Sequence, residues 1–391
     1  MKKLHRTHSS HRHVQPQVQT KMKTEEVARE LMKYKTVSPV EKPEIFQYLK
    51  GLLEEHGIDA DIHEIDGVYN LTAETGEGEP SICLNGHLDV VEPEGQWSVT
   101  EPFEPVIEDG KLYGRGASDM KAAFAAQVKA FIDLHKDSDF NGRAVLMAAG
   151  DEEIGGFKGS QPLVDKYYGE EQGFDYAIVG EATDMNVQVG TRGVVWLNIQ
   201  LEGEGIHASR ADLAQINIME ELPNVLDRLN NMKLTYENNG TLPDPSHEVT
   251  RVETTQTYNS VPGELEIGMD IRYLPSQNID QIVEDVEKAL EGIECGFRVE
   301  VEQDHGGAFE LSDEKFREAS VKALEEVRGE RPEEITDGGA SDGRFFAEKD
   351  TPFIELGTNQ KTVHGENEMC EVETLKKLRN SYYGISKRLA E

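Results

Sequence analysis

SICLNGHLDV, residues 81–90, decides the fold, because a short apolar run ends there in a histidine and an aspartate. Two later runs have the same form, AVLMAAGDEE at 144–153 and FDYAIVGE at 174–181. Apolar runs of this length, bounded by glycine and charge, are typical of strands buried on both faces of a mostly parallel sheet. Ligands bind beyond the carboxyl ends of such strands, so we expect the polar residues that close these runs to meet in one crevice.

Outward from these runs, strand-like segments alternate with helical patterns, which predicts an α/β layered domain in which helices flank the sheet. The expected strands lie near 60–64, 69–73, 81–88, 144–150, 175–180 and 352–356. The expected helices lie at 25–34, 43–56, 122–136, 313–328 and 373–389.

A different pattern interrupts this alternation after residue 190. Strand, helix, two strands, helix and strand follow one another between 191 and 304, which is the β-α-β-β-α-β order of a compact α+β, ferredoxin-like domain. Its ends would lie close together, as insertion into a host domain requires. We therefore expect a catalytic domain in two parts, 22–190 and 305–391, around an inserted lid and dimerisation domain.

Residues 1–21 are basic but have no apolar stretch, so they fit neither a signal peptide nor a membrane span, and we expect a disordered leader. Cys83, Cys295 and Cys370 have no metal-binding spacing. Their odd number, without a secretory segment, predicts reduced thiols and a cytoplasmic location.

The chain carries 75 acidic and 40 basic residues, a net charge of −35. Such a field repels nucleic acid and anionic membranes, so we expect neither as a partner. A solvated surface is one interpretation of this charge. The interpretation that we favour is a halophilic protein in a salt-rich cytoplasm, where screening reduces self-repulsion and dense carboxylates hold water.

The residues that close the apolar runs have the chemistry of a metal centre. His87 is a natural imidazole ligand, and Asp89, on the same face of the strand, is placed to orient the ring. Glu152 and Glu153 are adjacent and point in different directions, so one can bind metal while the other moves a proton. Any single acid here could instead be a surface carboxylate, and Asp119 could be a helix N-cap. The whole set, which also includes Glu181 and His364, makes coincidence improbable.

Eight segments in order resemble a known enzyme family. They are GHLDVV, FEPVIEDGKLYGRGASDMKAA, AGDEEIGG, VGEA, GIHAS, NSVPGELEIGMDIR, GGASDGRFF and ELGTNQKTVHGENE. Together they resemble the dinuclear zinc amidohydrolases, which include succinyl-diaminopimelate desuccinylase, acetylornithine deacetylase, aminoacylases and the bacterial glutamate carboxypeptidase. The resemblance extends from about Met22 to the C-terminus, and it implies a zinc-exopeptidase-like sheet.

The resemblance implies a role for each metal position. His87 and Glu181 would hold one divalent ion, Glu153 and His364 the other, and Asp119 would bridge them. Zinc is the first expectation, with cobalt and manganese as alternatives.

The resemblance also implies the catalytic roles. Asp89 would support His87, and Glu152 would be the general base that deprotonates the attacking water and then protonates the leaving amine. His207, from the inserted domain, would reach across a homodimer to the oxyanion of the tetrahedral intermediate. On the residues alone, His207 reads as a polar surface histidine.

The closest likeness is to the desuccinylase branch, in lysine biosynthesis. Five positions match that branch's contacts to substrate carboxylates or amides: Arg192, Asn259, Arg272, Gly339 and Ser341. An arginine fork suits a carboxylate, but either arginine could instead pair with a nearby acid. Ala340 departs from the branch, where a threonine is usual.

Rival activities use the same metals. They are an acetylornithine deacetylase of arginine biosynthesis or an acetyl-lysine deacetylase, and a dipeptidase or carboxypeptidase. A catalytically silent binding protein is disfavoured, because Glu152 and every ligand position are intact. The expected substrate is therefore a small N-acyl amino acid or dipeptide.

Overall fold

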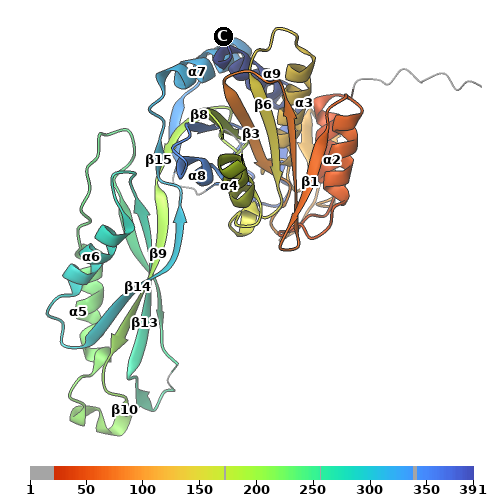
Figure 1. The fold of residues 1–391 in the computed structure, drawn as a ribbon. Helices are drawn as coiled ribbons and strands as arrows, with labels where there is room; N and C mark the ends of the chain where they lie inside the picture. Colours follow the sequence, from red (N-terminus) through yellow and green to blue (C-terminus); the bar gives the residue numbers. More distant parts are fainter. Residues whose placement is uncertain (1–21, 171–172, 256, 338–340) are drawn as a thin grey trace, which may run out of the picture.

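The computed structural model of the protein describes residues 22–170, 173–255, 257–337 and 341–391, and it has the predicted α/β fold (Figure 1). Within these residues, a nine-stranded sheet runs in the order β1-β2-β6-β3-β7-β17-β8-β15, and β16 pairs with β8. The strands are β1 (Ala60–Ile65), β2 (Val68–Thr75), β3 (Ser81–His87), β6 (Arg143–Ala149), β7 (Tyr176–Val179), β8 (Val187–Thr191), β15 (Phe309–Glu310), β16 (Glu334–Asp337) and β17 (Phe353–Glu355). The expected leader, 1–21, lies outside the described residues.

The centre of the sheet is parallel. Strand β3 pairs in parallel with β6 on one side and with β7 on the other, and β7 pairs in parallel with β17. The edges differ, because β1, β2 and β6 are joined antiparallel, as are β17, β8 and β15. Since the central strands are parallel and in register, their carboxyl ends meet at one edge, where the site forms.

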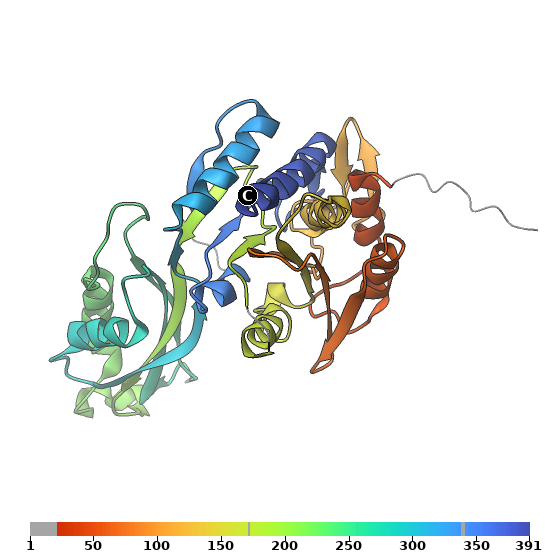
Figure 2. The same cartoon turned by 45° about the horizontal axis from the view of Figure 1, so that its top comes forward.

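Helices cover both faces of the sheet. Helices α1 (Thr24–Met32), α3 (Lys121–Lys136), α7 (Glu314–Arg328) and α9 (Val372–Leu389) pack together on one face, and Figure 2 shows α7 and α9 side by side. Helices α4 (Ser160–Glu170) and α8 (Gly343–Ala347) lie on the other face, and α2 (Glu44–Glu54) packs against β1 and β2. In the described ranges, no helix has both the length and the apolar character needed to cross a membrane.

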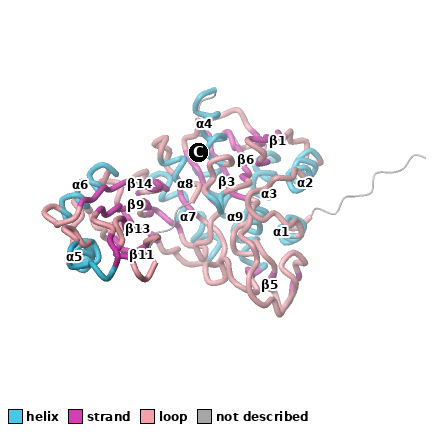
Figure 3. The backbone as a smooth tube through the Cα atoms, turned by 90° about the horizontal axis from the view of Figure 1, so that it is seen from below, coloured by secondary structure: helices cyan, strands magenta, loops and turns pink. Residues whose placement is uncertain are grey.

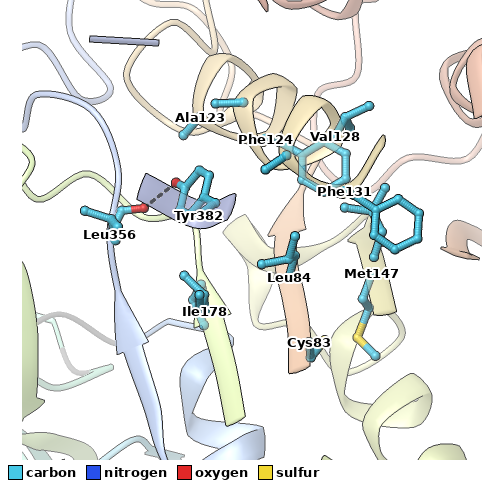
Figure 4. Packing of buried hydrophobic residues seen from close by; sticks show 14 of the residues in the cluster. Cys83, Leu84, Ala123, Phe124, Val128, Phe131, Met147, Ile178, Leu356 and Tyr382 are labelled. Atoms are coloured by element: carbon cyan, nitrogen blue, oxygen red, sulfur yellow. Dashed lines mark hydrogen bonds between the residues drawn. The ribbon is translucent and has the colours of Figure 1, made fainter. Parts of the chain in front are cut away.

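The core lies between the sheet and α3. Phe124, Val128 and Phe131 of α3 face Leu84 of β3 (Figure 4), and all four are fully buried. Helix α9 contributes Tyr382, whose hydroxyl donates to the Leu356 carbonyl just after β17. Packing of this kind fixes the strand ends on which the site depends.

A second, antiparallel sheet has four strands in the described chain, in the order β11-β13-β9-β14. Its elements follow the order β9 (Gly193–Glu202), α5 (Ile218–Asn231), β11 (Ser246–Glu253), β13 (Glu264–Tyr273), α6 (Ile279–Leu290) and β14 (Gly296–Gly306). Figures 1 and 3 show this unit beside the α/β body, with α5 and α6 on one face of its sheet. A separate apolar core lies between those helices and the strands.

Two small sheets complete the described chain. Strands β10 (Ile206–His207) and β12 (Ser260–Val261) pair at the end of the four-stranded unit that is farthest from the α/β body (Figure 1). Strands β4 (Val106–Glu108), β5 (Lys111–Tyr113) and β18 (Met369–Glu371) form the other sheet. Its pairing of β5 with β18 brings the segment before Asp119 against the segment after His364.

Candidate metal centre

The site is built where the central strands end. His87 is the last residue of β3, and the Glu152–Ile154 turn begins three residues after the end of β6. Glu181 follows β7 by two residues. Asp119 precedes α3 by two residues, and it does not cap that helix, because no side-chain cap bond forms there. Segments distant in sequence are thus gathered at one edge of the sheet.

The first group of donors surrounds the His87 imidazole. Its Nε2 lies 3.0 Å from Asp119 Oδ1, 3.7 Å from Glu181 Oε1 and 3.9 Å from Glu152 Oε2. His87 is almost fully buried. Three carboxylates from separate segments therefore converge on one ring nitrogen.

The second group surrounds the His364 imidazole. Its Nε2 lies 3.0 Å from Asp119 Oδ2 and 3.1 Å from Glu153 Oε2. Asp119 thus faces both imidazoles, one with each carboxylate oxygen, which is the arrangement expected of a bridging ligand. His364 has a positive φ of 59°, a conformation that a non-glycine residue adopts only when its surroundings hold it there.

Asp89 supports both groups from behind. Its carbonyl oxygen lies 3.0 Å from His87 Nδ1, and its Oδ1 lies 3.4 Å from the same atom. Its Oδ2 accepts a hydrogen bond of 3.0 Å from the Glu153 backbone amide. With Nδ1 facing these acceptors, Nε2 is the nitrogen that His87 presents to the cluster.

Several buried carboxyl groups lie close together at this site, and their surroundings shift their pKa values. Burial raises the pKa of Glu152 and of Glu181 well above the usual range for a carboxyl, and neighbouring carboxylates add to the effect. Burial opposes ionisation of Asp119 as well, but the hydrogen bonds from His364 and His87 outweigh it and lower its pKa. Hydrogen bonds to Asp119 and Glu153 raise the pKa of His364 to about 10.

These donors fit divalent cations. Within the described ranges, two sets of ligand atoms lie close enough to share an ion: one from His87, Asp119 and Glu153, the other from His87, Glu152 and Glu181. Buried oxygens of Glu153 and Glu181 have no hydrogen-bond partner among the described residues. Unpaired buried oxygens are costly unless a proton or a cation meets them. Imidazole and carboxylate donors together suit zinc and related ions.

Glu368 and Arg115 also belong to this region, although sequence analysis predicted a role for neither. Both are buried, and Glu368 accepts from Arg115 Nη1 at 2.6 Å. Glu368 also accepts from the backbone amide of Asp119. Glu368 follows the predicted ligand His364 by four residues, which was the available sequence signal. A single acid in a sequence does not by itself indicate that its side chain is buried.

Of the predicted substrate-binding residues, Arg192 and Arg272 both lie beside Ser246, whereas Asn259 lies at the far end of the four-stranded unit, next to β12. Arg192 Nη1 donates to the Asp244 carbonyl and to Ser246 Oγ, at 2.9 and 3.2 Å. Arg272 forms two hydrogen bonds with Asp270, which is the ion pair that the sequence left open as its alternative role.

The remaining predicted positions differ in their surroundings. Asn259 is exposed beside β12, and its side chain accepts from Thr257 Oγ1. Ser341 is buried and donates to Glu355. Gly339 lies outside the described residues.

His207 belongs to β10, at the end of the four-stranded unit farthest from the metal cluster (Figure 1). The side chain is exposed, and its Nδ1 lies 2.8 Å from Ser209 Oγ and accepts from the Ser209 amide. Within one subunit, therefore, His207 and the metal ligands are not brought together.

Known proteins resemble this chain over most of its length. The profile of Peptidase family M20/M25/M40 matches residues 83–388. A succinyl-diaminopimelate desuccinylase of Alkalilimnicola ehrlichii is 32% identical over 375 residues, covering 94% of this chain and 99% of the relative.

Solved structures share the fold. An aminopeptidase PepT of Bacillus cereus superposes with a TM-score of 0.76 at 20% identity, covering 94% of this chain and 98% of that one. A dinuclear metal-binding M20 peptidase of Bacillus subtilis superposes with a TM-score of 0.69 at 16% identity, covering 93% of this chain and 96% of that one.

Proposed function

Because the chain belongs to Peptidase family M20/M25/M40, and is thus a metal-dependent hydrolase of amide bonds, we propose that it removes the acyl group from a small N-acyl amino acid, first of all N-succinyl-diaminopimelate. The observation that carries the proposal is the convergence of His87, His364 and Asp119 with three glutamates at the carboxyl ends of the central strands. The named desuccinylase relatives, which align over nearly the whole chain, support the choice of acyl group.

The ligands divide into two sets around Asp119. His87 and Glu181 would hold one ion and Glu153 and His364 the other, with one Asp119 oxygen turned to each side. Two divalent ions, zinc in first place, would supply Lewis-acid charge that acidifies a water molecule and polarises the scissile carbonyl.

Glu152 is the residue that we assign to proton transfer. Its carboxylate lies at the edge of the first set, 3.9 Å from His87 Nε2, and has no contact with His364 in the structure. It would accept a proton from the attacking water and then donate it to the nitrogen of the leaving amine. Asp89 keeps the imidazole of His87 oriented during both transfers.

A second subunit would complete the site. An imidazole at the position of His207 can stabilise a developing oxyanion only if it reaches another subunit's cluster, because β10 lies far from the cluster in its own chain. A homodimer formed through the four-stranded unit, whose closure excludes water, satisfies this requirement.

Recognition of the carboxylates would fall to Arg192, Arg272, Asn259, Gly339 and Ser341. Arg272 is already paired with Asp270, so a substrate carboxylate would have to compete for that guanidinium. One observation favours a rival substrate: alanine at 340 lacks the hydroxyl that a threonine would offer to a succinyl group. An acetylated amino acid, or a dipeptide, makes less demand on that position.

A panel of substrates tests the proposal. Purified protein loaded with zinc, cobalt or manganese is assayed in high salt against N-succinyl-diaminopimelate, N-acetyl-ornithine, N-acetyl-lysine and dipeptides. The highest kcat/KM is expected for the succinylated substrate. Preference for an acetyl substrate or a dipeptide would contradict the acyl assignment. Binding of one of these molecules without hydrolysis of any would indicate a silent binding protein.

A further inference from the structure

We propose that Glu368 and Arg115 are positioning residues that hold Asp119 and His364 at the separation that a second metal ion needs. The inference rests on the proposed metal centre. It concerns two residues that touch neither the expected ions nor the expected substrate.

Glu368 organises the loop that ends in Asp119. Its Oε1 accepts hydrogen bonds from the Ser118 and Asp119 backbone amides, at 2.6 and 3.0 Å. Its Oε2 accepts from Arg115 Nη1 at 2.6 Å and from the Gly116 amide at 3.0 Å. Four donors therefore meet one fully buried carboxylate, and such charge-assisted bonds are about twice as strong as neutral ones.

Arg115 extends this support to the loop of His364. While Nη1 binds Glu368, Nη2 donates to the His364 carbonyl oxygen at 3.3 Å. The guanidinium is buried, and it lies over the ring of Trp97 with 5.5 Å between guanidinium carbon and ring centroid. The planar fork of arginine makes both contacts at once, which a lysine ammonium does not do with the same geometry.

The strained backbone of His364 is consistent with this role. A positive φ at a non-glycine residue persists only where neighbouring groups over-determine it. The Arg115 bond to the carbonyl of the same residue is one such constraint. It fixes the peptide from which the His364 imidazole reaches Asp119 and Glu153.

Other contacts join the same two loops without Glu368. Ser118 Oγ lies 2.7 Å from Thr362 Oγ1, and Thr358 Oγ1 donates to the Ser118 carbonyl at 2.7 Å. These bonds would keep the loops attached if Glu368 were changed. The expected consequence is a shift in ligand position, with the fold retained.

The two ion sites would not suffer equally. The ion between Glu153 and His364 would have two ligands that Glu368 and Arg115 hold in place, Asp119 and His364. The ion at His87 and Glu181 would have only one such ligand, Asp119. Loss of a group that orients a metal ligand typically weakens metal binding by about 10–100-fold. We therefore expect loss of that size at the second ion and a smaller loss at the first.

The test compares Glu368→Gln with a matched control, Asp285→Asn. Glutamine keeps the shape of Glu368, but its side-chain NH₂ group would face N–H groups that are themselves donors. Asp285 is also a buried carboxylate, which accepts from the Thr235 amide and hydroxyl at 2.5 and 2.9 Å, in the four-stranded unit. Stepwise Mn²⁺ binding is followed by electron paramagnetic resonance and calorimetry, and thermal unfolding is measured on the metal-free proteins.

The expected result is two ions bound by the unaltered protein and by Asp285→Asn, and a second ion weakened about 10–100-fold in Glu368→Gln. Equal weakening of both ions, unchanged affinities, or the same loss in the control would overturn the inference. If the unaltered protein bound no pair of ions, the proposed function itself would fail. Should Glu368→Gln not fold, Arg115→Lys replaces it; it keeps the charge but loses the fork, and unchanged affinity for the second ion would again refute the role.

Discussion

Glu152 and Glu153 are adjacent in sequence, and exchanging each for glutamine should separate proton transfer from metal binding. Glu153 Oε2 lies 3.1 Å from His364 Nε2, within the group around Asp119. Glu152 Oε2 is 3.9 Å from His87 Nε2, close enough that the group of His87, Glu152 and Glu181 could itself share an ion. The structure therefore admits two roles for Glu152, which predict different metal contents.

The expected magnitude follows from the chemistry of each position. A positioned general base contributes about 10²–10⁴-fold to the rate, so Glu152→Gln should lower kcat by that factor. The loss corresponds to roughly 2.7–5.4 kcal/mol of activation free energy, at about 1.36 kcal/mol for each factor of ten. Glu153→Gln removes a ligand and should lower both the metal content and the rate.

The assay measures bound metal after dialysis and kcat on the best substrate of the panel. Glu152→Gln should keep two ions and lose turnover, whereas Glu153→Gln should keep one. A Glu152→Gln protein that retained only one ion would show that Glu152 is a ligand. Retained activity in that variant would remove it as the base.

Metal binding should release protons, because hydrogen bonds to Asp119 and Glu153 raise the pKa of His364 to about 10 in the metal-free site. His364 is then protonated at pH 8, so a metal ion must displace its proton. As the pH is raised toward that pKa, the affinity for the second ion should increase about tenfold per pH unit. Calorimetry in buffers of different ionisation enthalpy measures the protons released, and a release of none would contradict this prediction. His207→Ala should lower kcat by roughly 10²–10³-fold without metal loss, as removal of an oxyanion donor does, and an unchanged rate would exclude that contact. More salt should raise the unfolding temperature, because the net charge is −35 and the Debye length falls from about 10 Å at 0.1 M to about 3 Å at 1 M; a falling unfolding temperature would refute the halophilic interpretation.

Much of the fold followed from apolar runs, but the direction of the edge strands did not. The alternation of strands and helices predicted the parallel centre correctly, since buried runs on both faces are typical of it. The antiparallel β1–β2 pair turns through Asp66 and Gly67, both with positive φ. An Asp-Gly pair between two strands is a strong hairpin signal, so this edge was predictable from the sequence and was missed.

The site was predictable to the extent that strand ends position it. His87, Glu152 and Glu181 each close or follow an apolar run, whereas His364 lies in a loop and was predicted only as a member of the whole set of acids and imidazoles. Glu368 and Arg115 lie 253 residues apart and meet only because β5 pairs with β18. Short edge strands of this kind carry little periodicity from which pairing could be predicted.

In a chain this acidic, an isolated carboxylate says little, and burial is what distinguishes the centre from the surface. Most acids of the described chain remain partly or fully exposed, where water meets their charge. At the site, oxygens of Glu153 and Glu181 are buried without a hydrogen-bond partner among the described residues, and burial, together with neighbouring carboxylates, raises the pKa of Glu152 and Glu181. Protons can supply positive charge there, but cations supply it while leaving the carboxylates ionised. Because protons and metal ions would bind the same carboxylate and imidazole groups, each metal ion taken up should displace protons. Metal uptake and proton release should therefore be coupled.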